Sequence, residues 1–267
     1  METNGFISIA EDWLYASLYA PDVEAPRSGV VLVAPYGEEK KCSARLLVRL
    51  ARALMSRGAV CLTIDLAGTG ESPEPDGPFG IERWTGEIAA VFERLRTRYP
   101  DCSWALAGFR LGACLVATAA ARATPDRLLL VEPFPNGQAF LEELLRRVHI
   151  QDMMTGQAHT RPEPDDVWKQ GGTVDFAGYR MTSRLAAGLR QLDLMQALKQ
   201  LPSSCRVQLI RVSASDRLPA RWRPLYDYVK EQPEGGIQTV KDKPFWGQID
   251  YYESDTLIDT ILAALHR

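Results

Sequence analysis

The sequence predicts an α/β protein built on a doubly wound, mostly parallel sheet that carries a helical lid insertion. Short apolar runs rich in β-branched residues, such as SGVVLVAPYG (28–37), are typical of strands buried on both faces. Stretches with helical spacing follow these runs, as at Ile88, Val91 and Leu95. Because strands alternate with helices along the chain, we expect parallel pairing with helices on both faces of the sheet.

The expected strands and helices follow one another in a regular order. AVCLTIDLAGTGES begins a second strand at Ala59 and enters a glycine-rich loop. WALAGFRLGACLVATAA combines a buried strand, a tight turn and a helix of small residues. Further strands are expected in RLLLV (127–131), RVQLIRVS (206–213) and GIQTVKD (236–242), and helices over 42–57, 81–98 and 250–266.

Two segments depart from this alternation. EDWLYASLYAP (11–21) is aromatic and roughly alternating, which predicts an antiparallel edge strand. Between residues 134 and 201, helical patterns over 140–149 and 185–199 flank a polar loop. We therefore predict a core formed by residues 1–133 and 202–267, with residues 134–201 as a lid over the carboxyl edge of the sheet.

Composition excludes several classes of function. The chain has 267 residues, 46% of them hydrophobic, and a net charge of −3 without any basic block, so nucleic acid is not an expected partner. Five scattered cysteines without CxxC spacing predict neither disulfides nor a metal site. No signal peptide, membrane span or cofactor motif is found, and we expect a cytoplasmic protein whose oligomeric state, including a homodimer, stays open.

The turn GFRLG (108–112) has the strand–turn–helix setting and G-x-x-x-G spacing of the nucleophile elbow of α/β-hydrolases. Arg110 occupies the position of the catalytic serine. In that fold the order is Ser, then Asp or Glu, then His. Asp216 follows a late strand where the acid is expected, but KDKPFWGQ, where the base is expected, contains no histidine. The chain's histidines lie elsewhere, at His149, His159 and His266.

Arg110 changes what such a site can do. Its guanidinium stays protonated at physiological pH, so it is neither a nucleophile nor a base. Beside the N-terminus of a helix it favours a bound carboxylate or phosphate. An internal ion pair is the alternative, and the candidate partners of Arg110 are Glu38, Glu39, Glu132 and Asp216. Both interpretations stay open, since a ligand can compete for the cation.

Six segments together resemble one bacterial subfamily of α/β-hydrolases, the exosortase A system-associated hydrolases of the second type. The resemblance implies the fold and a hydrolase-like character. That family tends to have paired glutamates in the first loop, an arginine at the elbow and Pro-Phe-Trp near the end, so the absent triad is implied to be a subfamily trait. The matching segments are APYGEEKKCSARLLVRLARAL (34–54), IDLAGTGES (64–72), GFRLGA (108–113), EPFPNGQAFLEELLR (132–146), DFAGYRMT (175–182) and KPFWGQ (243–248).

Two hypotheses of function follow from these residues. In the first, an enzyme handles an acyl or ester substrate that Arg110 anchors by a negative group, while Glu39 or Glu132 activates water. Asp216 completes the expected catalytic set, and backbone N–H groups near Tyr36 and Leu111 would stabilise an oxyanion. In the second, the protein is an inactive pseudo-hydrolase that binds an acidic ligand or regulates a partner. Under either hypothesis the aromatic rings of Phe245 and Trp246 line the site.

Overall fold

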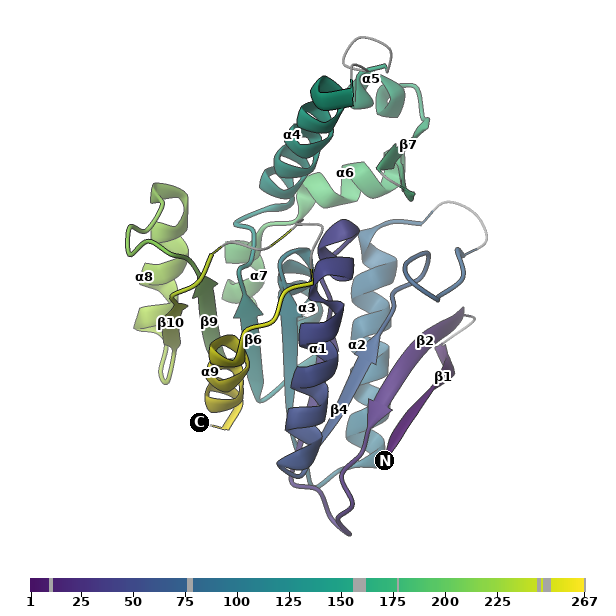
Figure 1. The fold of residues 1–267 in the computed structure, drawn as a ribbon. Coiled ribbons are helices and arrows are strands. Elements are labelled where there is room, and N and C mark those ends of the chain that lie inside the picture. Colours follow the sequence, from purple (N-terminus) through teal and green to yellow (C-terminus); the bar gives the residue numbers. More distant parts are fainter. Residues whose placement is uncertain are drawn as a thin grey trace.

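The computed structural model describes residues 1–9, 12–75, 79–155, 162–176, 178–243, 246 and 251–266. Its centre is an eight-stranded sheet in the order β1-β2-β4-β3-β5-β6-β9-β10, in which all pairings are parallel except β1 with β2 and β2 with β4 (Figure 1). The predicted fold class is confirmed. The strands are β1 (Glu2–Ile9), β2 (Asp12–Tyr19), β3 (Ser28–Val33), β4 (Ala59–Ile64), β5 (Ser103–Phe109), β6 (Arg127–Val131), β9 (Arg206–Val212) and β10 (Gly236–Val240).

Helices cover both faces of this sheet. On one face lie α1 (Glu38–Ser56) and α9 (Asp255–His266), which form one apolar core with the sheet. The other face carries α2 (Ile81–Arg98), α3 (Leu111–Ala123), α7 (Leu194–Lys199), η1 (Ala220–Trp222) and α8 (Arg223–Glu231), and this core is the larger. Fully buried side chains such as Trp84 and Phe92 of α2 anchor it.

The antiparallel strand expected over 11–21 is present as β2, but its predicted place at the edge is wrong. β1 pairs outside it, with Phe6 opposite Tyr15. The first half of β1 is exposed on both sides, so its sequence lacks the clear two-residue alternation by which a half-buried strand is recognised. Pairing with β2, rather than burial, holds this strand in place.

The described residues between 137 and 191 lie beyond the carboxyl edge of the sheet, at the top of Figure 1. They form α4 (Gly137–Thr155), α5 (Pro164–Lys169), α6 (Ser183–Gln191) and a hairpin of β7 (Thr173–Phe176) and β8 (Tyr179–Thr182). The single helix expected over 185–199 is two helices, because Asp193 caps a new one, α7, by accepting a hydrogen bond from the N–H of Gln196 (2.9 Å). None of the described helices has both the length and the apolar character of a membrane span.

The two glycines of GFRLG allow the close approach of backbone that the turn requires. A Cβ atom built on Gly108 would lie 2.4 Å from the carbonyl oxygen of Gly112. One built on Gly112 would lie 2.5 Å from the carbonyl oxygen of Ala34 and 2.6 Å from that of Val33. Helix α3 therefore packs directly against the end of β3, and this contact fixes the position of Arg110, the middle residue of the turn.

Candidate functional site

Arg110 is the single residue that connects the end of β5 to the start of α3. Its backbone has φ 55° and ψ −118°, which is unusual for a residue other than glycine. The N–H of Arg110 donates to the carbonyl oxygen of Val131 (2.9 Å), and its own carbonyl accepts from the N–H of Ala113 (3.1 Å). These bonds hold the strained turn and direct the side chain beyond the carboxyl edge of the sheet.

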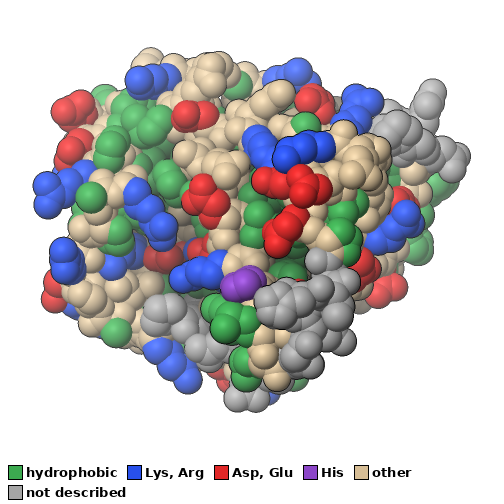
Figure 2. Space-filling view, turned by 90° about the horizontal axis from the view of Figure 1, so that it is seen from above, with side chains coloured by type: hydrophobic (Ala, Val, Ile, Leu, Met, Phe, Trp, Pro, Cys, Tyr) green, Lys and Arg blue, Asp and Glu red, His purple; other side chains and the backbone are tan. Residues whose placement is uncertain are grey.

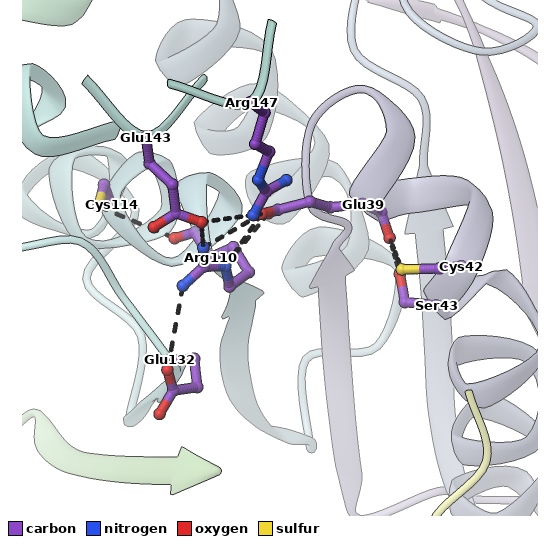
Figure 3. A network of polar contacts seen from close by, with 8 residues as sticks. All are labelled: Glu39, Cys42, Ser43, Arg110, Cys114, Glu132, Glu143 and Arg147. Carbon is purple, nitrogen blue, oxygen red and sulfur yellow. Dashed lines mark hydrogen bonds and ion pairs between the residues drawn. The ribbon is translucent and has the colours of Figure 1, made fainter. Parts of the chain in front are cut away.

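The guanidinium of Arg110 is buried, with 7% of its side chain exposed, and is held by two glutamates (Figure 3). Its Nε lies 3.3 and 3.2 Å from the two carboxylate oxygens of Glu39, and its Nη2 lies 3.1 Å from Oε1. The same Nη2 donates to Oε1 of Glu143 on α4 (2.6 Å). Burial alone would lower the pKa of Arg110, but the charges of Glu39 and Glu143 outweigh it and raise that pKa above its ordinary value.

A second arginine closes the network. Nη2 of Arg147 donates to Oε1 of Glu39 (2.6 Å) and contacts Oε1 of Glu143, one turn earlier on α4. We call Glu39, Arg110, Glu143 and Arg147 the Arg110 cluster. Its two cations and two anions balance, and it ties α1 and the elbow to α4, as Figure 3 shows.

Glu39 lies deeper than the sequence suggests. Helix α1 begins at Glu38, four residues before the predicted start at Cys42, so Glu39 belongs to its first turn. Both carboxylate oxygens are engaged by Arg110, and only 4% of the side chain is exposed. The carboxylate therefore stabilises the N-terminus of α1 through the helix dipole and also neutralises the buried charge of Arg110.

Glu132 approaches Arg110 from the end of β6 in another unusual backbone conformation, with φ 48°. Its Oε1 accepts from the N–H of Val212 (2.8 Å), and its Oε2 lies 3.9 Å from Nη1 of Arg110. Burial raises the pKa of Glu132, while the charge of Arg110 and the hydrogen bond from Val212 act in the opposite direction. Glu132 is thus a carboxyl group with an increased tendency to hold a proton.

Two aromatic rings flank the same guanidinium. Its carbon lies 4.2 Å from the ring centroid of Phe134 and 5.5 Å from that of Trp246, distances typical of cation–π contacts. The predicted neighbour Phe245 falls outside the described residues. The ring of Tyr36 packs against Phe140, with centroids 6.0 Å apart, and Phe140 in turn packs against Phe134, with centroids 5.3 Å apart.

A cavity of about 440 Å³ opens beside the cluster. We call it the arginine pocket, because arginines dominate its charged wall: Arg110, Arg146, Arg147, Arg211 and Arg221, against the carboxyl groups of Glu132 and Glu143. From above, this end of the molecule shows basic, acidic and hydrophobic side chains interspersed rather than one broad charged surface (Figure 2). On this face the positive charge of the pocket is therefore not part of a broad basic surface.

Arg211 contributes a buried charge to that wall. It is 8% exposed, and its guanidinium donates to the carbonyl oxygens of Ser215 (3.1 Å) and Arg217 (3.0 Å) and to Oγ of Ser213 (2.8 Å). Throughout the ranges that the structure describes, no carboxylate lies within 4.0 Å of it. Its polar atoms are satisfied by neutral groups, and the charge of Glu132 is the one that acts on it from the same cavity wall.

Comparison with solved structures finds several that share this fold. Est1E from Butyrivibrio proteoclasticus, solved with bound ferulic acid, superposes with a TM-score of 0.66 at 17% identity over 98% of this chain and 96% of that one. DcsB, solved with its substrate analogue, gives 0.65 at 14% identity over 100% and 98%. XC6422 from Xanthomonas campestris, an α/β serine hydrolase without a lid, gives 0.55 at 17% identity over 99% and 92%.

This chain has the α/β-hydrolase fold. No family model matches its sequence, and no curated protein is similar to it in sequence. In an α/β-hydrolase the residue at the elbow is the nucleophile, and the backbone N–H of the next residue helps form the oxyanion hole. Here that next residue is Leu111, the first of α3, whose N–H belongs to the helix turn that has no intrahelical acceptors.

Among the described residues, no candidate for the acid or the base of a hydrolase triad is brought to Arg110. Asp216 has 87% of its side chain exposed and contacts Lys241, so the structure places it outside the Arg110 cluster. His149 lines a separate cavity on α4, and His266 ends α9; His159 falls outside the described residues. Across the described chain, no three His, Cys, Asp or Glu side chains meet as metal ligands would.

Cys114 is the nearest thiol to the elbow. It lies one turn into α3, and its Sγ donates to the carbonyl oxygen of Phe134 (3.2 Å). Burial raises the pKa of this thiol to about 12, so it stays protonated and does not act as a thiolate nucleophile.

Sequence reasoning missed Glu143, Arg147, Phe134 and Arg211. A Glu–Arg pair four residues apart on a predicted helix was a visible signal for the first two, because such side chains lie side by side. That this pair faces Arg110 depends on how α4 crosses the sheet edge.

Proposed function

We propose that this protein binds an anionic small molecule in the arginine pocket and does not carry out serine-hydrolase chemistry. The observation that carries the proposal is the charge of the pocket wall. Arg110 and Arg147 are balanced by Glu39 and Glu143, and the three further arginines then face only one carboxyl group, that of Glu132. These three are Arg146, Arg211 and Arg221. Arg211 adds a buried charge to this attraction, because no carboxylate of the described residues contacts it. A dianion would offset that charge, and the preorganised donors of the site would compensate its loss of hydration.

In this proposal Arg110 is not the residue that directly anchors the ligand. Its Nε and Nη2 are committed to Glu39 and Glu143, which supports the internal ion pair, while Nη1 is on the side of Glu132. Arg110 therefore shapes the pocket and contributes charge to it, and the other arginines of the wall bind the ligand.

A hydrolytic activity is the second candidate, and Glu132 is the observation that favours it. A carboxyl group with a raised pKa on the wall of a polar pocket suits general acid–base catalysis on a bound acyl or ester substrate. Glu39 is less suited to that role because both of its oxygens are bound to Arg110. In such an enzyme the N–H groups of Tyr36 and Leu111 would face the oxyanion.

We extend the proposal to the origin of the chain. We propose that it belongs to the exosortase A system-associated hydrolases of the second type and that its setting is bacterial and cytoplasmic. We also propose that residues 134–201 form a lid. The arginine at the elbow, Glu38 with Glu39 and the Trp246 contact with Arg110 support that assignment.

Ligand binding is tested by titrating the protein with sulfate in a calorimeter, since sulfate keeps its charge over the working pH range. We expect the double variant Arg146→Gln/Arg221→Gln to bind sulfate about tenfold more weakly, because two charged donors leave the wall. The control Arg57→Gln/Arg122→Gln removes the same charge from exposed positions outside the pocket and should keep the affinity. Equal losses in both variants would show a non-specific charge effect and contradict the proposal.

Serine chemistry is tested with a fluorophosphonate probe and p-nitrophenyl esters. We expect no covalent labelling and no esterase burst, because the elbow presents Arg110 and no described histidine lies beside it. An active serine esterase treated in parallel serves as the positive control. Labelling of any serine in this chain would overturn the proposal.

Sulfate affinity should also increase as the pH falls. The pKa of Glu132 lies above its ordinary 4.5, so lowering the pH neutralises this carboxyl group and removes a negative charge facing the ligand. We expect at least about a threefold gain once Glu132 is protonated. Glu132→Gln should bind sulfate with little pH dependence; the same dependence in that variant would assign it to another group.

A further inference from the structure

A second pocket lies on the other side of the Arg110 cluster. It has a volume of about 80 Å³, roughly half that of a cavity known to hold benzene. Its wall is mostly apolar and comes from the first loop, α4 and the β7–β8 hairpin: Tyr36, Phe140, Leu144, Val148, Phe176 and Tyr179. We call it the apolar pocket.

The two pockets share part of one wall. Phe134, Glu143 and Arg147 line both of them, so these side chains stand between a cationic cavity and an apolar one. Within this shared wall Arg147 is paired with Glu143, and it is also paired with Glu39; Figure 3 shows these ion pairs.

Arg147 is the part of that wall best able to move. Its side chain is 31% exposed, whereas that of Arg110 is 7% exposed. Glu39 and Glu143 each have a second contact, with Arg110, so neither carboxylate loses its last cation when Arg147 turns away. An anion in the arginine pocket would replace the charge that Arg147 gives up.

We propose that the ligand is an amphipathic anion, with its charged group in the arginine pocket and a short apolar chain in the apolar pocket. This inference rests on the proposed function and adds the chemical class of the ligand. Arg147 turns from Glu39 toward the charged group, and the chain passes through the shared wall beside Phe134. The apolar walls then bury the chain, and each methylene group removed from water adds to the affinity.

The test compares methyl sulfate with n-butyl sulfate, which carry the same charge and differ only in chain length. We expect n-butyl sulfate to bind about tenfold more tightly than methyl sulfate. Leu144→Phe, which narrows the apolar pocket, should remove most of this gain while leaving sulfate affinity unchanged. Leu145→Phe is the matched control. Leu145 is the next residue of α4; it lines neither of the two pockets and instead lines a separate cavity.

The outcomes separate this inference from the proposal on which it rests. If neither sulfate nor its esters bind, both fail. If sulfate binds but the butyl chain adds nothing, the amphipathic ligand alone is contradicted. If the butyl chain adds affinity that Leu144→Phe does not reduce, the chain lies outside the apolar pocket and the inference is again wrong.

Discussion

Replacing Arg110 with methionine is expected to lower the free energy of unfolding by about 3–5 kcal/mol, the range for breaking a buried ion pair from one side. The variant leaves Glu39 and Glu143 with only Arg147 as their cation, and the Glu39 side chain is 4% exposed. Because the guanidinium is buried, solvent screens little of this effect. Urea unfolding followed by circular dichroism measures it.

A second substitution distinguishes loss of charge balance from loss of packing. In Arg110→Met/Glu39→Gln the remaining pair, Glu143 with Arg147, is balanced again. We expect the double variant to be more stable than Arg110→Met alone, even though it lacks one more native group. If the two single effects simply add, the cluster does not act as a unit and this account of it is wrong.

Replacing Gly112 with alanine should destabilise the protein by about 3 kcal/mol, at the upper end of the usual cost of overpacking. The new methyl group would meet carbonyl oxygens of Val33 and Ala34 at 2.6 and 2.5 Å, and backbone atoms at the end of a central strand cannot move aside as a flexible side chain would. Thermal unfolding reports the loss as a lower Tm.

Gly86 provides the matched control for that experiment. It also lies within a helix, α2, but a Cβ atom built on it has no neighbour within 4 Å. Alanine there should stabilise the protein by about 0.5–1 kcal/mol, because glycine is a poor helix former. Similar losses at both positions would mean that the tight contact of α3 with β3 is not the cause.

Both predictions concern the same turn, which retains the architecture of a nucleophile elbow while presenting a cation. The backbone strain at Arg110, with φ 55°, persists although no nucleophile is displayed there. Contacts of Gly108 and Gly112 with the neighbouring backbone maintain it. The side chain can therefore change its chemistry without any change in the fold around it.

Elements whose signal is local were predicted well. The helix over 81–98 and the strand over 127–131 agree with the structure to the residue, because the apolar spacing of each and its limits are visible in a short stretch of sequence. The outer strand β1 and the β7–β8 hairpin were not predicted. Both are short or exposed elements that are stabilised by pairing with a neighbouring strand. The sequence of a single strand does not indicate which strand it pairs with.

The residues of the candidate site also differ in how far the sequence predicts them. The sequence predicted that Arg110, Glu39, Glu132 and Trp246 share one edge of the sheet, because each follows a predicted strand and the carboxyl ends of parallel strands meet there. Asp216 satisfied the same rule, but the structure places it in solvent beside Lys241. Position after a strand limits a residue to one edge of the sheet and does not set the direction of its side chain.

The sequence by itself determined the class of fold, the place of the elbow and the chemistry that Arg110 excludes, because these depend on local periodicity and on the identity of single residues. Only the tertiary structure decided which carboxylates surround Arg110, that Arg147 completes the cluster, and that a cationic and an apolar pocket share a wall. These features arise where α4 crosses the edge of the sheet. The crossing is set by packing between segments about a hundred residues apart in the chain, such as Glu39 and Arg147.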